Sequence, residues 1–182
     1  MSAPAKTLIG RARAVPLTAA CFAIAAAAAA TLAAAWFFQL VLGYAPCELC
    51  LYQRMPYYFI VPFALILGFL ARHWRYSNMA RAGLLVMALL LAFNAGLGVY
   101  HAGIEWDWWQ GPVSCSGGGS SAPSGDILSA LKRSSVVPCN EAPWRFLGLS
   151  FAGYNTLIAG ALALVAIAAA RLPAYGSSSV SQ

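Results

Sequence analysis

The residue pair best suited to chemistry is Cys47 and Cys50, which stand in the sequence Cys-Glu-Leu-Cys. Pro46 comes directly before them and is typical of a helix start. At a helix N-terminus, the free backbone N–H groups and the helix dipole favour a thiolate and lower the pKa of a thiol. A thiolate of low pKa is a good leaving group in thiol–disulfide exchange. The pair therefore predicts a redox-active disulfide.

A second cysteine pair, Cys115 and Cys139, is separated by a Gly/Ser-rich segment at 116–125. Such a linker lets the two cysteines approach with little strain and leaves them exposed, and exposed disulfides exchange readily. From this pair alone, a structural disulfide that braces the loop is the simpler interpretation. The fifth cysteine, Cys21, lies in an alanine-rich run and is expected to be a small buried hydrophobic residue.

Two further residues are candidates for ligand binding. On a continuous helix, Arg54 shares a face with Cys47 and Cys50, because the spacing is i, i+3, i+7. An arginine near hydrocarbon is costly, so it is a functional candidate that can stabilise the Cys50 thiolate or donate to a ligand carbonyl. The alternative is a side chain that extends to the lipid headgroups. His101 ends the third predicted helix at the depth of the cysteines and can bind a carbonyl or relay a proton. Its alternative is an ordinary interfacial histidine.

Metal and haem sites are not predicted. A structural zinc site usually presents two Cys-x-x-Cys or Cys-x-x-His units, and this chain has one. Covalent c-type haem needs Cys-x-x-Cys-His, and Leu51 occupies the histidine position.

The composition indicates a protein that is solvated by lipid. Of 182 residues, 61% are hydrophobic and 9% are charged, whereas soluble domains carry about 25% charged residues. The net charge of +6 does not indicate nucleic acid, because the charges are too few and scattered for a phosphate-binding face.

Four apolar segments are long enough to span a membrane, which takes about 20 residues of helix. They predict an all-α membrane protein, a four-transmembrane-helix bundle, as a single integral membrane domain over 1–182. The helices are expected at 16–43, 51–71, 82–100 and 151–170, with outward-facing loops at 44–50 and 101–150. The first segment resembles a signal peptide, but its apolar stretch exceeds the roughly 7–15 residues of a signal core. We therefore expect it to be retained.

The distribution of charge predicts the orientation. The segments before the first helix, between the second and third, and after the fourth contain arginine or lysine and no acidic residue; all five acidic residues fall in the other two loops. Because basic residues stay on the cytoplasmic side, both termini are expected in the cytoplasm. The four polar-region cysteines then lie on the outer, oxidising side of a bacterial inner membrane, where disulfides persist.

With these features together, the chain resembles the DsbB family of membrane proteins that form disulfide bonds and reduce quinone. The resemblance covers nearly the whole chain. It includes residues 47–54 (Cys-Glu-Leu-Cys-Leu-Tyr-Gln-Arg), the separated cysteine pair, and residues 146–149 (Phe-Leu-Gly-Leu). The chain departs from the family at Gln53, where a glutamate is frequent, and in the Gly/Ser-rich insert after Cys115.

The resemblance implies roles for the cysteine pairs. Cys115 and Cys139 are similar to the pair that exchanges with a periplasmic DsbA-like thiol oxidase, and Cys115 is favoured as the residue that is attacked. Cys47 and Cys50 are similar to the pair that reoxidises them and delivers electrons to a membrane quinone, ubiquinone or menaquinone. This relay is a known property of the family.

The resemblance also implies roles for the ligand-binding candidates. Cys50 is expected to meet the quinone, with Arg54 in the position of the family's quinone-binding arginine. His101 is similar in position to a family histidine near the quinone. Two alternatives remain: a relative of the vitamin K epoxide reductases, in which the Cys-x-x-Cys falls late in the chain, and a non-catalytic membrane subunit with structural disulfides.

The predicted orientation can be tested by labelling. In intact spheroplasts, a membrane-impermeant thiol reagent should label Cys115 and Cys139 after reduction, since neither is separated from it by the bilayer. Mass spectrometry of the labelled peptides identifies the sites, and Cys21 should stay unlabelled as an internal control. Labelling that requires lysis would contradict the orientation.

Overall fold

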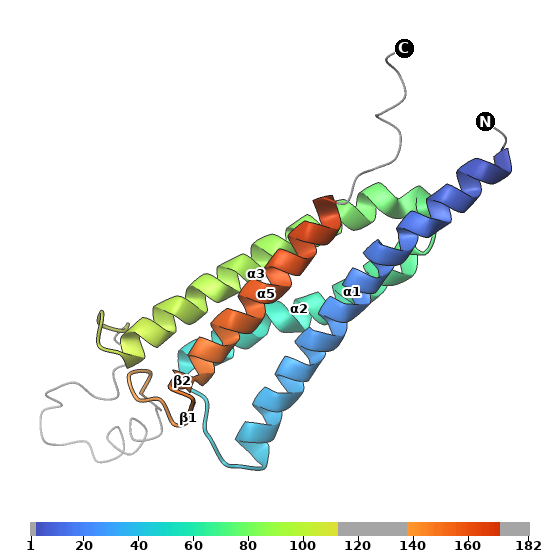
Figure 1. The fold of residues 1–182 in the computed structure, drawn as a ribbon. Coiled ribbons are helices and arrows are strands. Elements are labelled where there is room, and N and C mark those ends of the chain that lie inside the picture. The colour runs from blue at the N-terminus through green and yellow to red at the C-terminus, as the bar shows by residue number, and fades with distance from the viewer. Residues whose placement is uncertain (1–2, 113–137, 172–182) are drawn as a thin grey trace, which may run out of the picture.

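The computed structural model describes residues 3–112 and 138–171, which form an extended bundle of long helices (Figure 1). The helices are α1 (Ala3–Leu40), α2 (Glu48–Ala71), the 3-10 helix η1 (Trp74–Tyr76), α3 (Ser77–Glu105) and α5 (Phe151–Arg171). A small antiparallel hairpin of β1 (Arg145–Phe146) and β2 (Leu149–Ser150) precedes α5.

The four-helix membrane bundle predicted from the sequence is confirmed. The spans long and apolar enough to cross a membrane are Pro16–Leu40, Glu48–Ala71, Ser77–Glu105 and Phe151–Arg171. Large apolar side chains point outward; Leu89, Phe93 and Leu164 are each more than two-thirds exposed. Hydrocarbon solvates such a surface without the cost that water imposes.

Two helices extend beyond the predicted bounds at the end of the bundle that carries the cysteines. α2 begins at Glu48 rather than at residue 51, and α3 continues to Glu105 rather than ending at residue 100. An acidic residue is favourable in the first turn of α2, because it faces the positive end of the helix dipole. In α3, the added turn is buried in the bundle, so His101 and Glu105 follow one another on the inner face.

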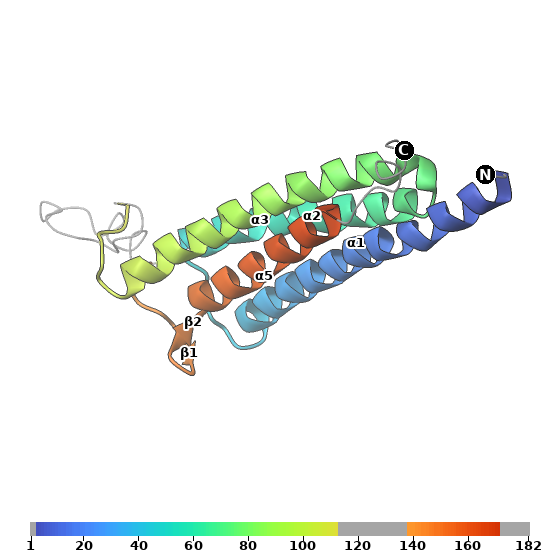
Figure 2. The ribbon, with the colours of Figure 1, turned by 45° about the horizontal axis from the view of Figure 1, so that its top comes forward.

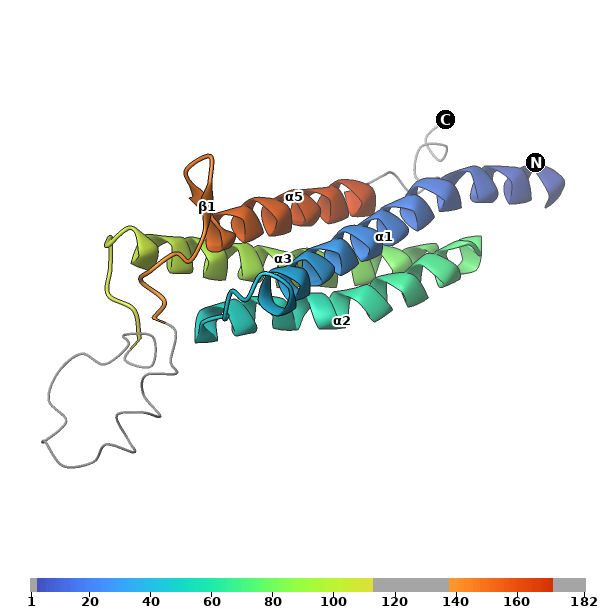
Figure 3. The same ribbon diagram turned by 90° about the horizontal axis from the view of Figure 1, so that it is seen from below.

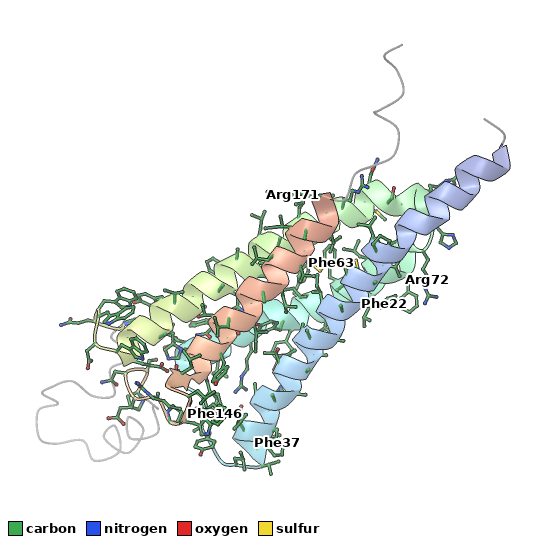
Figure 4. The ribbon with its side chains drawn as sticks, in the orientation of Figure 1. Phe22, Phe37, Phe63, Arg72, Phe146 and Arg171 are labelled. Atoms are coloured by element: carbon green, nitrogen blue, oxygen red, sulfur yellow. The ribbon has the colours of Figure 1, made fainter. Side chains whose placement is uncertain are left out.

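The two ends of the bundle differ in what they carry. The start of α1, the α2–α3 connection and the end of α5 lie at one end, and the hairpin lies at the other (Figures 1 and 2). Phe22 and Arg72 are near the first end, and Phe37 and Phe146 near the second (Figure 4). The Arg72 guanidinium lies 5.7 Å from the centre of the Phe22 ring. The basic residues of the α2–α3 connection are therefore at the end opposite the hairpin.

The hairpin falls within the stretch expected to be an irregular loop. Its turn residues, Leu147 and Gly148, have φ angles of 48° and 82°, the left-handed region that a two-residue hairpin turn requires. The hairpin lies against the start of α5 (Figure 3), and the Tyr154 hydroxyl donates a 3.1 Å hydrogen bond to the Phe146 carbonyl. This turn therefore fixes the chain next to the cysteine end of the bundle.

Close packing of α3 on α5 depends on one glycine. A Cβ atom added at Gly98 would collide with the Thr156 hydroxyl and lie 3.1 Å from the Ala152 carbonyl oxygen, whereas one added at Gly96 would meet nothing within 4 Å. Small residues at such positions let membrane helices approach closely.

We therefore predict that Gly98→Ala destabilises the bundle by about 1–3 kcal/mol through overpacking. Gly96→Ala is the matched control, and its effect should be neutral or slightly stabilising because alanine favours helix over glycine. Thermal unfolding in detergent, followed by circular dichroism, measures both. Equal melting temperatures for the two variants would contradict the close packing.

Candidate functional site

The Cys47–Cys50 pair stands at the first turn of α2. Cys47 is the N-cap residue, with an extended backbone (φ −74°, ψ 171°), and its sulfur accepts a 3.4 Å hydrogen bond from the Cys50 backbone N–H. The two sulfurs lie 3.2 Å apart, and both thiols are free. The helix start predicted from Pro46 is thus present, and the pair is positioned to become a disulfide on loss of two electrons and two protons.

The surroundings of Cys47 favour its thiolate. The hydrogen bond with the Cys50 thiol is the largest cause that lowers the pKa of the Cys47 thiol, and the hydrogen bond with His101 acts in the same direction. Burial of Cys47 opposes them but does not outweigh them, so the pKa lies well below its usual range. The reduced pair therefore carries its negative charge on Cys47.

His101 is buried in the centre of the site. Its side chain is 2% exposed, so it is not an ordinary interfacial histidine. The Nε2 atom lies 3.5 Å from the Cys47 sulfur and 3.8 Å from Oε1 of Glu105, one turn further along α3. On the other side of the ring, the Gln53 side-chain amide lies 2.9 Å from Nδ1. His101 thus joins the cysteine pair to polar groups of α2 and α3.

Arg54 is bonded to α1. Its NH1 group donates a 2.6 Å hydrogen bond to Oε1 of Gln39 and its NH2 group a 3.4 Å bond to the Ala35 carbonyl. The guanidinium also lies 5.7 Å from the centre of the Trp36 ring. Within the described residues, no hydrogen bond joins Arg54 to a cysteine. Its contacts therefore hold the guanidinium against α1, where Arg54 lines a cavity.

A cavity of about 390 Å³ lies beside the cysteine pair. Cys47, Cys50, Arg54 and His101 all line it. Its aromatic and aliphatic lining includes Leu32, Phe38, Tyr44, Trp144, Phe146, Phe151, Tyr154 and Ile158. The Trp144 and Phe151 rings stack with centres 5.0 Å apart, and Phe38 packs edge-on against Phe151 at 4.8 Å. An apolar cavity of this size with a few polar groups is typical of a small-molecule site.

Cys139 lies against the same end of the bundle. It is disulfide-bonded, and it packs in one buried cluster with Cys47, Leu49 and Ile104. Its exposed fraction is 1%, so the prediction that the loop cysteines are exposed is wrong for Cys139. The physical reason is that its segment folds down over the start of α2 instead of extending into solvent. Cys115 lies outside the described residues.

Several polar residues of the site were not predicted. They are Gln53, Tyr57, Glu105 and Asn155, which all line the cavity. Gln53 was noted only as a departure from the family. They could have been found as single polar residues within apolar spans. A polar side chain there is costly unless it forms a hydrogen bond with another polar group. Glu105 was assigned to the outer loop, because the third helix was expected to end before it.

Three residues of the site are also arranged as metal ligands would be. The ligand atoms of Cys47, Cys50 and His101 lie within 4.8 Å of one another. A thiophilic ion there would engage the same sulfurs that form the disulfide, so metal binding and redox cycling would compete.

A multi-pass membrane bundle with a free Cys-x-x-Cys pair against an apolar cavity defines a class, the membrane thiol–disulfide oxidoreductases. The family model described as Disulfide bond formation protein DsbB matches residues 17–169. The chain therefore belongs to the DsbB family. It is a multi-pass membrane protein that takes part in disulfide bond formation.

Relatives agree with this assignment. A Disulfide bond formation protein B of Verminephrobacter eiseniae is 30% identical over 152 residues, covering 80% of this chain and 81% of that protein. Another, of Albidiferax ferrireducens, is 29% identical over 72% of this chain and 75% of its own. An uncharacterized protein of Rickettsia prowazekii is 24% identical over 70% and 72% of the two chains. No solved structure matches the chain significantly.

The lowered pKa of Cys47 predicts an unusual pH dependence. In the reduced protein, the rate of Cys47 alkylation by iodoacetamide should fall much less than the roughly 100-fold expected of an ordinary thiol between pH 8 and pH 6. The thiolate persists below the pKa of the unfolded chain and is lost only as the pH falls through the lower, folded value. Peptide mass spectrometry follows the reaction.

Cys50→Ala provides the comparison, because it removes the largest cause of the lowered pKa. Its Cys47 should show a steeper loss of rate with falling pH. A tenfold loss per pH unit in the unaltered protein would show that Cys47 has an ordinary pKa.

Proposed function

We propose that this chain is a protein-disulfide:quinone oxidoreductase of a bacterial inner membrane. It oxidises a periplasmic DsbA-like thiol oxidase and passes the electrons through two cysteine pairs to a membrane quinone. The observation that carries the proposal is the placement of the Cys47–Cys50 pair. The pair lines an apolar cavity on one side and packs against Cys139 of the loop on the other.

The cavity residues fit a quinone. The stacked rings of Trp144 and Phe151 match a flat, apolar head group. Arg54 is held by α1 with its guanidinium on the cavity wall, and such a group donates to carbonyl oxygens. A bound quinone supplies an acceptor for two electrons and two protons.

The chain's own groups transfer the electrons in two exchanges. First, the Cys115–Cys139 disulfide is reduced to two thiols as a disulfide forms between the two thiols of the oxidase. These loop thiols then reduce the Cys47–Cys50 disulfide and return to the oxidised state. Each exchange breaks one S–S bond and forms another through a mixed disulfide. The Cys47–Cys50 dithiol finally loses two electrons and two protons, with Cys50 on the wall of the cavity.

The stabilised Cys47 thiolate supports this direction of flow. A disulfide whose reduced form is stabilised is a stronger oxidant, so the opened pair is a favourable receiver of electrons from the loop. We also propose that both termini are cytoplasmic and that the hairpin end of the bundle faces the periplasm, in agreement with the basic α2–α3 connection. A non-catalytic subunit would have no use for a free, close pair of thiols beside a cavity.

For Arg54→Met, we predict that the disulfides still form but that the apparent KM for quinone rises by about tenfold, the loss expected for a hydrogen bond from a charged donor. Steady-state kinetics with a soluble quinone analogue measure it. Arg72→Met is the control, since Arg72 contacts Phe22 and Phe69 at the opposite end of the bundle. Unchanged quinone kinetics in Arg54→Met would exclude a binding role.

For the loop pair, we predict that Cys139→Ser accumulates a covalent complex with the oxidase through Cys115, because the cysteine that would resolve the mixed disulfide is absent. Cys47→Ser should allow one exchange at the loop pair and stop delivery to quinone. Non-reducing gels detect the complex, and Cys21→Ser should behave as the unaltered protein. Sustained turnover by both Cys115→Ser and Cys139→Ser would instead mean direct attack on Cys47–Cys50.

A further inference from the structure

A chain of hydrogen bonds begins at Tyr57 of α2 and passes through side chains of α5, α2 and α3 to Cys47. The Tyr57 hydroxyl donates to Oδ1 of Asn155 at 2.8 Å, and Nδ2 of Asn155 donates to Oε1 of Gln53 at 2.8 Å. The Gln53 Nε2 atom lies 2.9 Å from Nδ1 of His101. His101 Nε2 lies 3.5 Å from the Cys47 sulfur. Four helical side chains thus lead to one thiol.

Each bond of this chain fixes the direction of the next. The Asn155 side-chain oxygen accepts the hydrogen bond from Tyr57, so the amide nitrogen of Asn155 faces Gln53. Gln53 accepts that bond through its oxygen, so it presents its nitrogen to His101. An amide nitrogen only donates, and Nδ1 must therefore accept. In the neutral ring, the proton then resides on Nε2, the atom that faces Cys47.

Burial makes this direction costly to reverse. Tyr57, Gln53 and His101 are 1%, 5% and 2% exposed, so each offers little surface on which water could replace a lost hydrogen bond. Turning one amide would set nitrogen against nitrogen or oxygen against oxygen. The two amides can therefore turn only together, with the Tyr57 hydroxyl then accepting from Asn155. In the orientation that the structure has, Tyr57 donates, and this sets the direction of the chain of bonds.

We propose that Asn155 is a positioning residue that acts through Gln53 to fix the tautomer of His101, so that Nε2–H donates to the Cys47 sulfur. The functional role of this tautomer rests on the proposed function: the Nε2–H group stabilises Cys47 as a thiolate in the reduced pair. Asn155 does not touch the cysteines and acts only through the two side chains between.

The other charged groups around His101 agree with this direction. On α3, Glu105 places Oε1 3.8 Å from Nε2, further than the Cys47 sulfur and on the same side of the ring, so it too favours a proton on Nε2. Arg145 of the hairpin donates to the Glu105 backbone carbonyl. At the start of α2, Cys47 faces Nε2 of the ring and Cys50 lies next to Cys47, whereas Arg54 is turned to α1. From α5, the chain of bonds contributes only the uncharged Asn155.

The test measures the tautomer directly. In the reduced protein, with His73→Gln so that His101 is the sole histidine, 15N NMR distinguishes the protonated from the unprotonated ring nitrogen. We expect Nε2 protonated and Nδ1 free. Asn155→Asp keeps the shape of the side chain but removes the donor to Gln53, and Gln53→Glu replaces the donor to Nδ1 with an acceptor. Both should move protonation toward Nδ1.

The second readout is the rate of Cys47 alkylation at pH 6, which should fall by about tenfold in Asn155→Leu as the thiolate loses its hydrogen bond. Thr156→Val is the matched control on α5, because its hydroxyl bonds to the Ala152 carbonyl of the same helix and is not one of the groups that join Asn155 to His101. Its tautomer and alkylation rate should be unchanged. Circular dichroism and melting temperature check that each variant folds.

A protonated Nδ1 in the unaltered protein would overturn the inference, as would an unchanged tautomer and alkylation rate in both Asn155 variants. Equal effects of Thr156→Val and Asn155→Leu would also overturn it, since they would indicate a loss of packing. These measurements use no quinone and no oxidase. A failure here therefore leaves the proposed electron transfer standing, and a failure of quinone reduction leaves the tautomer result intact.

Discussion

Buried polar side chains inside a lipid-solvated bundle must bond mainly to one another, and the cysteine end of this protein is organised around that constraint. Gln53, Tyr57 and His101 are buried and satisfy one another and Asn155 in a fixed order. This chain of hydrogen bonds ends at the Cys47 sulfur. Because each group depends on the next for its partner, the position of the helices and the electrostatics of the thiol are set by the same bonds.

The site joins two environments. On one side of the Cys47–Cys50 pair is an apolar cavity with aromatic walls, suited to a ligand that arrives from lipid. On the other, the buried Cys139 lies in the same cluster as Cys47, so a loop cysteine is close to the membrane pair. In the proposed relay, this proximity, rather than exposure of a loop disulfide, is what brings the loop cysteine to the membrane pair.

Gln53 shows how one residue adapts a shared motif. An ionised glutamate at this position, which the resemblance to the family led us to expect, would only accept hydrogen bonds. Glutamine accepts a hydrogen bond from Asn155 and donates one to His101. The orientation of Asn155 therefore determines which atom of Gln53 faces His101. Arg54, its neighbour in sequence, points instead to Gln39 and Ala35 of α1. Two adjacent residues of the motif thus bond to different helices, Gln53 to α3 and α5 and Arg54 to α1.

The sequence alone determined the four spanning helices, the helix start at Cys47 and the family, since apolar length, helix capping and a contiguous motif are local properties of the chain. It also placed Arg54 and the cysteines on one helix. It did not determine the burial of Cys139, the extension of α3 through His101 and Glu105, or the polar chain through Asn155. Those depend on contacts between residues far apart in sequence: 48 positions for Gln53 with His101 and 102 for Asn155 with Gln53. Only the packing of the helices decides such contacts, because no periodicity within one helix specifies which face of another it meets.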